Sequence, residues 1–197
     1  MAKMQSTLKN MAMSLTLISL FASAALGFVY EFTKGPIEIS LLNKKLDAIK
    51  QVVPEFTNNP NEEMFKLPTG EGDSLEVYPA KKGDEVVGYA IKSYTNKGFS
   101  GYIGLMVGFK PDGTIYNINV LEQKETPGLG TKMVPEGTPD QPSFKDQFKE
   151  KNPVSFALKV KKDGGPVDAI TAATISSRAF CDGVQRAYNT FEKGGLK

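Results

Sequence analysis

The sequence predicts an α+β fold, in which a single N-terminal transmembrane helix precedes one domain built from an antiparallel sheet flanked by helices. Three observations predict it. An uncharged apolar run lies near the start of the chain, strand-like segments joined by short turns occupy the middle, and an apolar pattern of helical spacing lies near the end. Consecutive strands followed by a helix are typical of α+β domains and not of alternating α/β folds.

The first element is predicted to cross a membrane. Residues 11–30 carry no charged side chain, and twenty such residues form a helix long enough to span roughly 30 Å of hydrocarbon. Lys3 and Lys9 precede this run and no acid does, so the positive-inside rule predicts a cytoplasmic segment over residues 1–10 and an extracytoplasmic remainder. A cleaved signal peptide is the competing interpretation, because Ala22-Ser23-Ala24 is a fair cleavage site. The apolar run continues beyond that site, which favours an uncleaved anchor.

Residues 31–74 are expected to form a connecting helix and a loop. Pro36 lies where proline is favoured, at a helix start, and Pro54 is expected to stop the same helix. Apolar residues recur at helical spacing between the two prolines, so we expect this helix to pack on the domain. Residues 57–73 are rich in Asn, Pro, Gly and acidic residues, which is typical of a loop.

The domain is expected to span residues 75–197 and to contain a meander of strands. Strand-like runs lie at residues 75–78, 85–94, 102–110 and 114–121. Pro111-Asp112-Gly113 predicts a hairpin turn, because proline presets φ and glycine accepts a positive φ.

Further elements are expected after these strands. A short helix is predicted at residues 144–150 and a strand at residues 154–160. The last helix is predicted from an apolar recurrence at Ile175, Ala179, Phe180, Val184, Tyr188 and Phe191.

The composition excludes several classes of protein. The chain has no histidine and one cysteine, so it lacks Ser-His-Asp and Cys-His machinery, a zinc or iron–sulfur site of its own and an internal disulfide. Cys181 is expected to be a buried structural thiol. Acidic and basic residues are interspersed, with a net charge of +2, and form no basic stripe of the kind that a nucleic-acid partner requires. The chain has neither a P-loop nor a dinucleotide-binding glycine motif, so a bound nucleotide has to be held in another way.

A hydroxyl-rich segment precedes the last helix. Asp168-Ala-Ile-Thr-Ala-Ala-Thr-Ile-Ser-Ser177 combines one acid with four hydroxyl side chains. Thr174, Ser176 and Ser177 are placed at the helix start, where free N–H groups and the positive end of the dipole favour an anion. A hydroxyl there is well placed to carry or contact a phosphate. The alternative is an N-cap cluster, because Ser and Thr are preferred at helix starts for capping alone.

A second segment, Glu125-Thr-Pro-Gly-Leu-Gly130, follows the last strand-like run of the meander. Two glycines flank one apolar residue after a proline, which describes a rigid loop with close backbone approach. Taken alone, this segment is a turn.

Together, these two segments resemble the covalent-FMN domain family of membrane redox complexes. The resemblance covers nearly the whole chain and is closest to the G subunit of Rnf, the ion-translocating ferredoxin:NAD oxidoreductase complex. In this family the last threonine of an Asp-x-x-Ser/Thr-Gly-Ala-Thr motif bears FMN through a phosphoester bond, so the resemblance implies covalent FMN on Thr174. Ala172 stands where the family usually has glycine. Its methyl group is expected to require a negative φ and slightly more room.

The resemblance also implies a wider cofactor site. Its expected residues, besides Thr174, are Glu125, Thr126, Leu129, Gly130, Asp168, Thr171, Ala173, Ser176, Ser177, Gly101 and Tyr102. Gly101, Tyr102 and the Leu129-Gly130 pair are expected to wall the isoalloxazine ring, which needs flat apolar or backbone surfaces. The alternative is that Phe99 and Tyr102 are core or strand aromatics and that the glycines are turns.

More specific contacts are expected for Glu125, Asp168 and Thr171. Glu125 is expected to hydrogen-bond the loop backbone or the flavin, or else to lie in solvent. Asp168 and Thr171 are expected to orient the loop through bonds from side chain to backbone. No residue is expected to be catalytic, and none is expected to bind a metal.

The function implied by the resemblance is that of an electron-carrier subunit in a bacterial inner membrane, within a complex that couples ferredoxin and NAD redox chemistry to Na⁺ or H⁺ transport. Its implied partners are the other subunits, the membrane and a flavin transferase that reads the acceptor motif, with no nucleic acid. One alternative is the C subunit of the Na⁺-translocating NADH:quinone oxidoreductase, which is usually longer than this chain. The other is a tethered extracytoplasmic ligand-binding or scaffold domain without a redox role.

Overall fold

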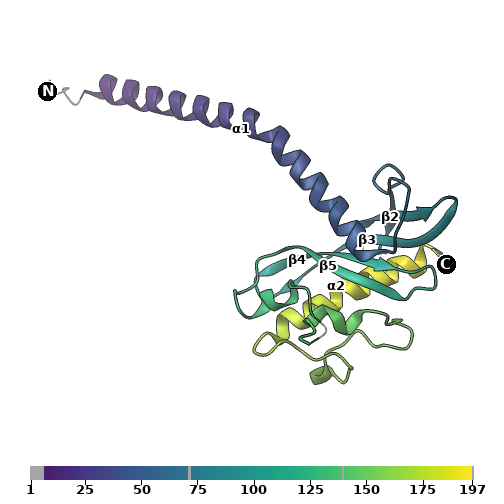
Figure 1. The fold of residues 1–197 in the computed structure, drawn as a ribbon. Helices are drawn as coiled ribbons and strands as arrows, with labels where there is room; N and C mark the ends of the chain where they lie inside the picture. The colour runs from purple at the N-terminus through teal and green to yellow at the C-terminus, as the bar shows by residue number, and fades with distance from the viewer. Residues whose placement is uncertain (1–6, 71, 139, 197) are drawn as a thin grey trace. The chain divides into compact units, whose positions relative to one another are not determined.

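The computed structural model describes residues 7–70, 72–138 and 140–196 (Figure 1). Lys3, one of the two lysines behind the expected orientation, lies outside these residues. The chain divides by its internal contacts into two units, Met1–Lys44 and Lys45–Lys197. Residues 45–74, expected to connect the membrane helix to the domain, therefore belong to the second compact unit.

Helix α1 (Leu8–Val52) is one continuous α-helix of 45 residues. It passes through Pro36, so the expectation that a separate helix starts at this proline was wrong. A proline in a helix interior removes one i→i−4 hydrogen bond, but the uninterrupted bonds on either side maintain so long a helix. The helix ends two residues before Pro54, as predicted.

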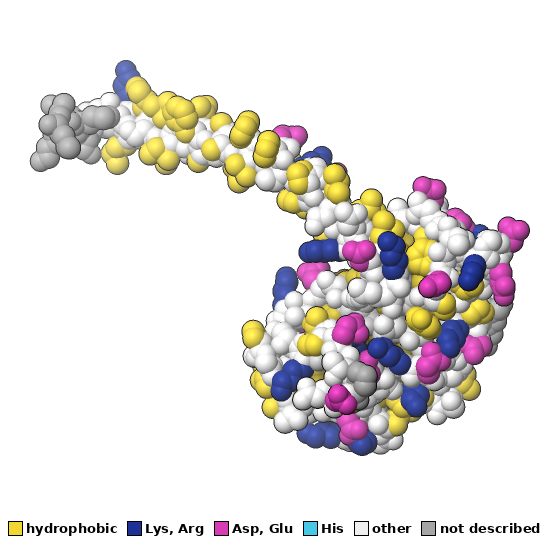
Figure 2. Space-filling model, in the orientation of Figure 1, with side chains coloured by type: hydrophobic (Ala, Val, Ile, Leu, Met, Phe, Trp, Pro, Cys, Tyr) yellow, Lys and Arg dark blue, Asp and Glu magenta, His cyan; other side chains and the backbone are white. Residues whose placement is uncertain are grey.

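The N-terminal part of α1 has an apolar surface. Large apolar side chains are exposed along it from Leu8 to Leu42, and Figure 2 shows them as yellow atoms along this stretch. The helix is long and apolar enough, by length and composition, to cross a membrane. Exposure of so many apolar groups to water is unfavourable, whereas hydrocarbon accepts them without cost.

The sheet of the second unit is a five-stranded antiparallel meander with strand order β1-β2-β3-β4-β5. Its strands are β1 (Phe65–Pro68), β2 (Ser74–Lys82), β3 (Glu85–Gly98), β4 (Gly101–Phe109) and β5 (Ile115–Gln123). The four strands predicted for the meander are confirmed, as is the hairpin turn before β5, where Gly113 has φ +82°. Strand β1 falls inside the predicted loop 57–73, so that prediction was wrong over these four residues. Four residues are too few to show a reliable alternation.

Each face of the sheet is covered by a helix. Helix α2 (Thr174–Lys193) packs against β3 and β4, as Figure 1 shows for the yellow ribbon. The last turn of α1 covers the other face, where Ile49 and Val52 are fully buried. Neighbouring residues of a strand serve different faces: Ile91 belongs to the α2 side and Ala90 to the α1 side. The predicted antiparallel sheet flanked by helices is confirmed.

The segment between the sheet and α2 contains three short 3₁₀ helices, η1 (Gly130–Met133), η2 (Phe144–Phe148) and η3 (Lys161–Asp163). Helix η2 confirms the short helix predicted there. Residues 154–160, all of them described, contain no strand, and Val160 forms only an isolated bridge with Val167. A turn begins at Asn152, whose side-chain oxygen accepts the N–H of Val154 at 3.0 Å. Beyond it Leu158 and Val160 are buried and Lys159 is exposed, so the residues alternate in burial without forming a strand.

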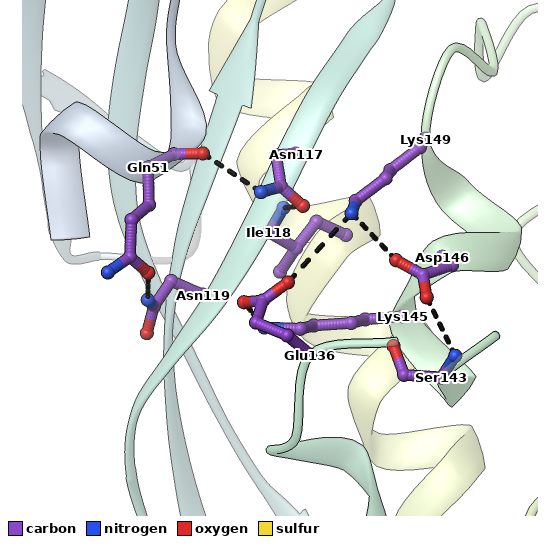
Figure 3. A network of polar contacts seen from close by, with 9 residues as sticks. All are labelled: Gln51, Asn117, Ile118, Asn119, Glu136, Ser143, Lys145, Asp146 and Lys149. Carbon is purple, nitrogen blue, oxygen red and sulfur yellow. Dashed lines mark hydrogen bonds and ion pairs between the residues drawn. The ribbon is translucent and has the colours of Figure 1, made fainter. Parts of the chain in front are cut away.

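Polar contacts join the end of α1 to the sheet and also hold residues of the connecting segment to one another (Figure 3). The main-chain oxygen of Gln51, in the last turn of α1, accepts a hydrogen bond from the Asn117 side chain of β5 at 2.9 Å. In the following segment Glu136 forms an ion pair with the buried Lys145. Lys149 pairs with Asp146 at 2.7 Å. The two ion pairs hold residues 136–149 of the long connection together.

Candidate functional site

The two motifs meet at one cavity of about 370 Å³. It is lined by Phe99, Glu125, Thr126, Leu129, Gly130, Ala172, Ala173, Thr174, Ile175 and Ser176. The sheet explains the meeting, because β4 pairs with β5 so that Ile103 lies opposite Gln123. This register brings the tip of the β3–β4 hairpin beside the loop that follows β5, and the start of α2 completes the wall.

Thr174 is the first residue of α2 and is half-buried. Its Oγ1 atom accepts a hydrogen bond from Nζ of Lys162 at 3.3 Å. The residue at the N-cap position is Ala173, whose methyl side chain cannot cap a helix. Because no N-cap side chain occupies them, backbone N–H groups at the start of α2 are available to bind an anion.

The neighbouring hydroxyls have other partners, which contradicts the interpretation of an N-cap cluster. Ser176 is buried and its hydroxyl donates to the carboxylate of Glu125. The Ser177 hydroxyl donates to the carbonyl of Ala173 at 3.0 Å and accepts the N–H of Ile170 at 2.9 Å. Ser177 is fully buried and does not line the cavity. Its two hydrogen bonds join the loop to the helix.

Glu125 is a buried carboxylate, with 4% of its surface exposed. It accepts the backbone N–H of Ser100 at 2.9 Å and the hydroxyl of Ser176. A buried carboxylate is costly unless such donors compensate for lost water. Glu125 therefore makes the expected bond to backbone, although the partner belongs to the hairpin tip and not to its own loop. The alternative, in which its side chain lies in solvent, was wrong. Glu125 ties the hairpin, the loop and α2 together.

Two glycines make room for this carboxylate. A Cβ atom added to Gly130 would lie 2.7 Å from both Cβ of Glu125 and Oγ of Ser176. One added to Gly98 would lie 2.7 Å from Oε1 of Glu125. The close backbone approach predicted for Gly130 is present, and it results from packing and not from a positive φ.

Ala172 contradicts the expectation of a negative φ, because its φ is +60°. The N–H of Ala173 bonds the carbonyl of Ile170 at 2.9 Å, and this tight turn leads directly into α2. The turn imposes the left-handed conformation, which costs an alanine about 1–2 kcal/mol more than a glycine would pay. The methyl group is exposed, so space is available although the backbone is strained.

Gly101 and Tyr102 are both described by the structure and do not line this cavity. Gly101 has φ +96° and closes the β3–β4 turn, whereas Tyr102 stacks on Tyr94 with a ring distance of 5.9 Å. The alternative in which Tyr102 is a strand aromatic therefore matches the geometry, and burial raises the pKa of its hydroxyl.

Phe99 and Ile175 line the cavity and were not expected to. They are 68% and 48% exposed, so they are apolar walls that remain accessible. Phe99 was considered only as a core or strand aromatic, although an aromatic residue between glycines was a usable signal of an exposed turn. Ile175 was included in the buried stripe of α2, because helical spacing does not show where the covered surface of an element ends.

Asp168 and Thr171 line a separate, more open groove of about 820 Å³. The carboxylate of Asp168 pairs with Lys161 at 2.7 Å, and its backbone N–H donates to the Gln147 side chain at 2.8 Å. The prediction that the Asp168 side chain bonds the loop backbone was therefore wrong, because its carboxylate pairs with Lys161. Thr171 is exposed.

Cys181 confirms the expectation of a buried thiol. It is 3% exposed within α2, and burial raises its pKa to about 12. The neutral thiol persists at physiological pH, so this residue is a small apolar group of the core and not a nucleophile.

Comparison with known proteins defines the class of this fold and site. The profile of the FMN-binding domain family matches residues 98–189, a range that contains the hairpin tip, the loop 125–130 and the start of α2. The chain is thus a protein with an FMN-binding domain and an N-terminal apolar helix.

Three relatives narrow this class. The chain is 34% identical to the G subunit of the ion-translocating oxidoreductase complex of Pasteurella multocida, over 89% of each chain. It is 30% identical to the G subunit of the Na⁺-translocating ferredoxin:NAD⁺ oxidoreductase complex of Acetobacterium woodii, over 93% of this chain and 91% of the relative. It is 31% identical to the corresponding G subunit of Aliivibrio fischeri, over 93% and 90%. The chain belongs to the family of G subunits of ion-translocating oxidoreductase complexes.

Proposed function

We propose that this chain is the electron-transfer subunit of such a complex and carries FMN as a phosphoester on Thr174. The observation that supports this function is the position of Thr174. Its hydroxyl stands at the first residue of α2 and lines the cavity that both motifs form, within a chain of the G-subunit family. The complex would couple ferredoxin and NAD redox chemistry to translocation of Na⁺ or H⁺.

The cavity residues fit a flavin. Phe99, Leu129 and Ile175 are exposed apolar side chains on three different segments, and apolar walls of this kind suit an isoalloxazine ring. The uncapped start of α2 suits the phosphate. When bound, FMN supplies the electron-accepting and electron-donating chemistry, while the protein fixes its position and tunes its potential.

The other residues of the cavity have supporting roles in this proposal. Thr126 holds the loop in shape, because its carbonyl accepts the N–H of Leu129 at 3.1 Å. Gly130 lets the loop approach Glu125, which in turn holds Ser176 and the hairpin tip. Ala173 keeps the helix start free of a capping side chain. None of these groups has to act as an acid, a base or a nucleophile during electron transfer.

We propose that residues 11–30 cross the bacterial inner membrane, with residues 1–10 in the cytoplasm. The remaining residues, including the FMN-binding domain, would then lie on the extracytoplasmic side. The order of positive and uncharged residues supports this orientation. A flavin transferase would read the acceptor segment during maturation, and the other subunits would contact the chain in the mature complex.

Intact-protein mass spectrometry tests the attachment. Protein purified from its native membrane should carry the mass of FMN less one water, and its flavin fluorescence should survive denaturation. Thr174→Ala should abolish both signals while the domain stays folded, because Thr174 is only half-buried and the N-cap position belongs to Ala173. Thr174→Ser is the matched control, since it keeps a hydroxyl.

Two results would count against this proposal in different ways. Covalent flavin retained in Thr174→Ala would exclude Thr174 as the acceptor. A wild-type chain purified without any covalent flavin, from cells that make an active complex, would favour a tethered domain without a redox role.

A further inference from the structure

Lys162 is the residue whose side chain contacts the proposed acceptor hydroxyl. Its Nζ donates to Oγ1 of Thr174 at 3.3 Å from helix η3, twelve positions earlier in the chain. No motif in the sequence pointed to this lysine, which belongs to a Lys-Lys pair of the kind that usually lies in solvent.

The turn that carries Lys162 is fixed on both sides. Lys161 pairs with Asp168, the first residue of the acceptor segment, at 2.7 Å. Asp163 accepts two hydrogen bonds of 2.7 Å from the guanidinium of Arg178, in the second turn of α2. A bidentate arginine–carboxylate pair gives a defined geometry. The two neighbours of Lys162 are therefore bound to the two ends of the acceptor region, and the lysine between them faces the acceptor.

The backbone of this turn is equally constrained. Gly164 ends η3 with φ +81°, and a Cβ atom on Gly165 would lie 2.0 Å from the carbonyl oxygen of Lys159. The N–H of Val167 bonds that same carbonyl at 3.1 Å. The turn is thus closed on itself before it reaches Asp168, so the position of Lys162 depends on backbone geometry as well as on ion pairs.

We propose that Lys162 is a positioning residue for the FMN phosphate, and this inference rests on attachment at Thr174. A phosphodiester on Oγ1 carries one negative charge, shared by its two non-bridging oxygens. These oxygens are bonded to the phosphorus atom that Oγ1 would carry, so they would lie close to Oγ1. An ammonium binds such oxygens as a point charge, and the start of α2 adds its dipole on the same side. Lys162 holds the phosphate against the helix start and so sets the direction in which the flavin leaves Thr174.

Four variants of the full chain, each produced with a flavin transferase, separate charge from structure. Lys162→Gln removes the charge, Lys162→Glu reverses it and Lys162→Arg keeps it. Lys159→Gln is the matched control, because Lys159 is an exposed lysine beside the same turn, and among the described residues the hydrogen bond to Thr174 comes from Lys162 and not from Lys159. Phosphorus NMR of the flavinylated protein is the primary measurement, and intact mass gives the fraction of chain that carries flavin.

We expect the phosphorus resonance to move in Lys162→Gln and further in Lys162→Glu, while Lys162→Arg and Lys159→Gln stay close to wild type. The flavinylated fraction should fall several-fold in the Gln and Glu variants and recover in Arg. Flavinylation lost entirely in Gln but restored in Arg would support the same role.

An unchanged resonance and flavinylated fraction in both the Gln and Glu variants would overturn it. That result would leave Thr174 as the acceptor, since the Thr174→Ala experiment tests attachment separately.

Discussion

At the scale of single residues, Ala172 is a strained position that a single substitution can relieve. Its φ of +60° costs an alanine about 1–2 kcal/mol, and glycine avoids that cost. Glycine also makes the unfolded chain more flexible, which costs about 0.4–1 kcal/mol. We therefore expect Ala172→Gly to raise the free energy of unfolding by up to about 1.6 kcal/mol, measured by denaturant unfolding of the full chain.

Ala169→Gly is the matched control for this change, because Ala169 lies in the same segment without a positive φ. It should lower the free energy of unfolding, since it adds flexibility without relieving strain. Equal destabilisation by both substitutions would show that the turn at Ala172 is not left-handed in solution.

Gly130 is a second position where one side chain decides the geometry. Any Cβ there meets Glu125 and Ser176 at 2.7 Å, and a β-branched residue adds further bulk. We expect Gly130→Val to keep covalent flavin on Thr174, to expose the flavin and shift its potential, and to lower ferredoxin:NAD turnover of the assembled complex sharply. Spectroscopy and turnover are measured on complexes matched for subunit content, with Gly130→Ala as the milder variant. If the valine variant has the wild-type flavin potential and turnover, the loop is only a turn and does not contact the flavin.

Cys181 gives a dependence on pH. Its pKa is raised from 9.0 to about 12 by burial. Between these values the unfolded chain has lost the thiol proton and the folded chain has kept it, so stability falls as pH rises through this window. Cys181→Ala should flatten that alkaline loss, as followed by urea unfolding at several pH values, although the smaller side chain lowers stability at every pH. An equally steep alkaline loss in Cys181→Ala would assign it to other groups.

These residues show where sequence reasoning succeeded and where it could not. The hydroxyl cluster and the helical spacing placed Thr174 at a helix start, and the structure agrees. The left-handed Ala172 was not predictable from its identity, because alanine ordinarily indicates a negative φ. Lys162 was not predictable either, since its contact with Thr174 depends on how hydrogen bonds within residues 159–167 close the turn that carries it.

At the scale of elements, the contact of α1 with the sheet depends on Gly108 of β4. A Cβ atom there would lie 1.5 Å from the backbone oxygen of Val52, so the end of the helix rests directly on the strand. Backbone atoms cannot move aside as a side chain can, and overpacking typically costs about 1–3 kcal/mol. We expect Gly108→Ala to lower the free energy of unfolding by at least this amount.

Gly35→Ala is the control for this substitution, because Gly35 is a helical glycine with no neighbour within 4 Å of an added Cβ. It should be neutral or slightly stabilising, as alanine favours a helix interior. Thermal unfolding of both variants in the same detergent distinguishes them. Wild-type stability in Gly108→Ala would mean that the last turn of α1 can move away from β4 without cost.

The elements also show the limits of pattern reading. Strands β2 to β5 have 9 to 14 residues, and their pattern and turns were long enough to be recognised. Strand β1 has four residues and was missed, while residues 156–160 alternate in burial without forming a strand. The single helix α1 was divided at Pro36 because proline favours a helix start locally, whereas the continuity of 45 residues is a property of the whole element.

At the scale of the whole molecule, the site exists because the meander brings distant segments together. The start of β4 pairs with the end of β5, which places Phe99 beside the loop at Glu125, and Ser176 of α2 then bonds that carboxylate. The resemblance pointed to Gly101 and Tyr102 near the hairpin tip, whereas the residue of this tip that lines the cavity is Phe99. A sequence of alternating residues predicts that strands exist, and only their register shows which turns become neighbours.

The membrane topology is the remaining property of the whole chain. Helix α1 has 45 residues and a length of roughly 68 Å at 1.5 Å per residue, whereas the hydrocarbon core needs only about 20 residues. Residues 11–30 are the uncharged part, so this part should lie in the bilayer and the rest of the helix beyond it. We therefore expect a reporter fused after Lys197 to be active only outside the cytoplasm, and one fused after Asn10 only inside.

Extraction of the native chain should require detergent, because apolar side chains and not charges attach it to the membrane. High salt or alkali should leave it in the pellet. The N-terminal sequence of the mature protein decides between an anchor and a signal peptide. An intact N-terminus agrees with the anchor, whereas a soluble form beginning near Ala25 would show that the segment is removed and that the domain reaches its complex without a helix of its own.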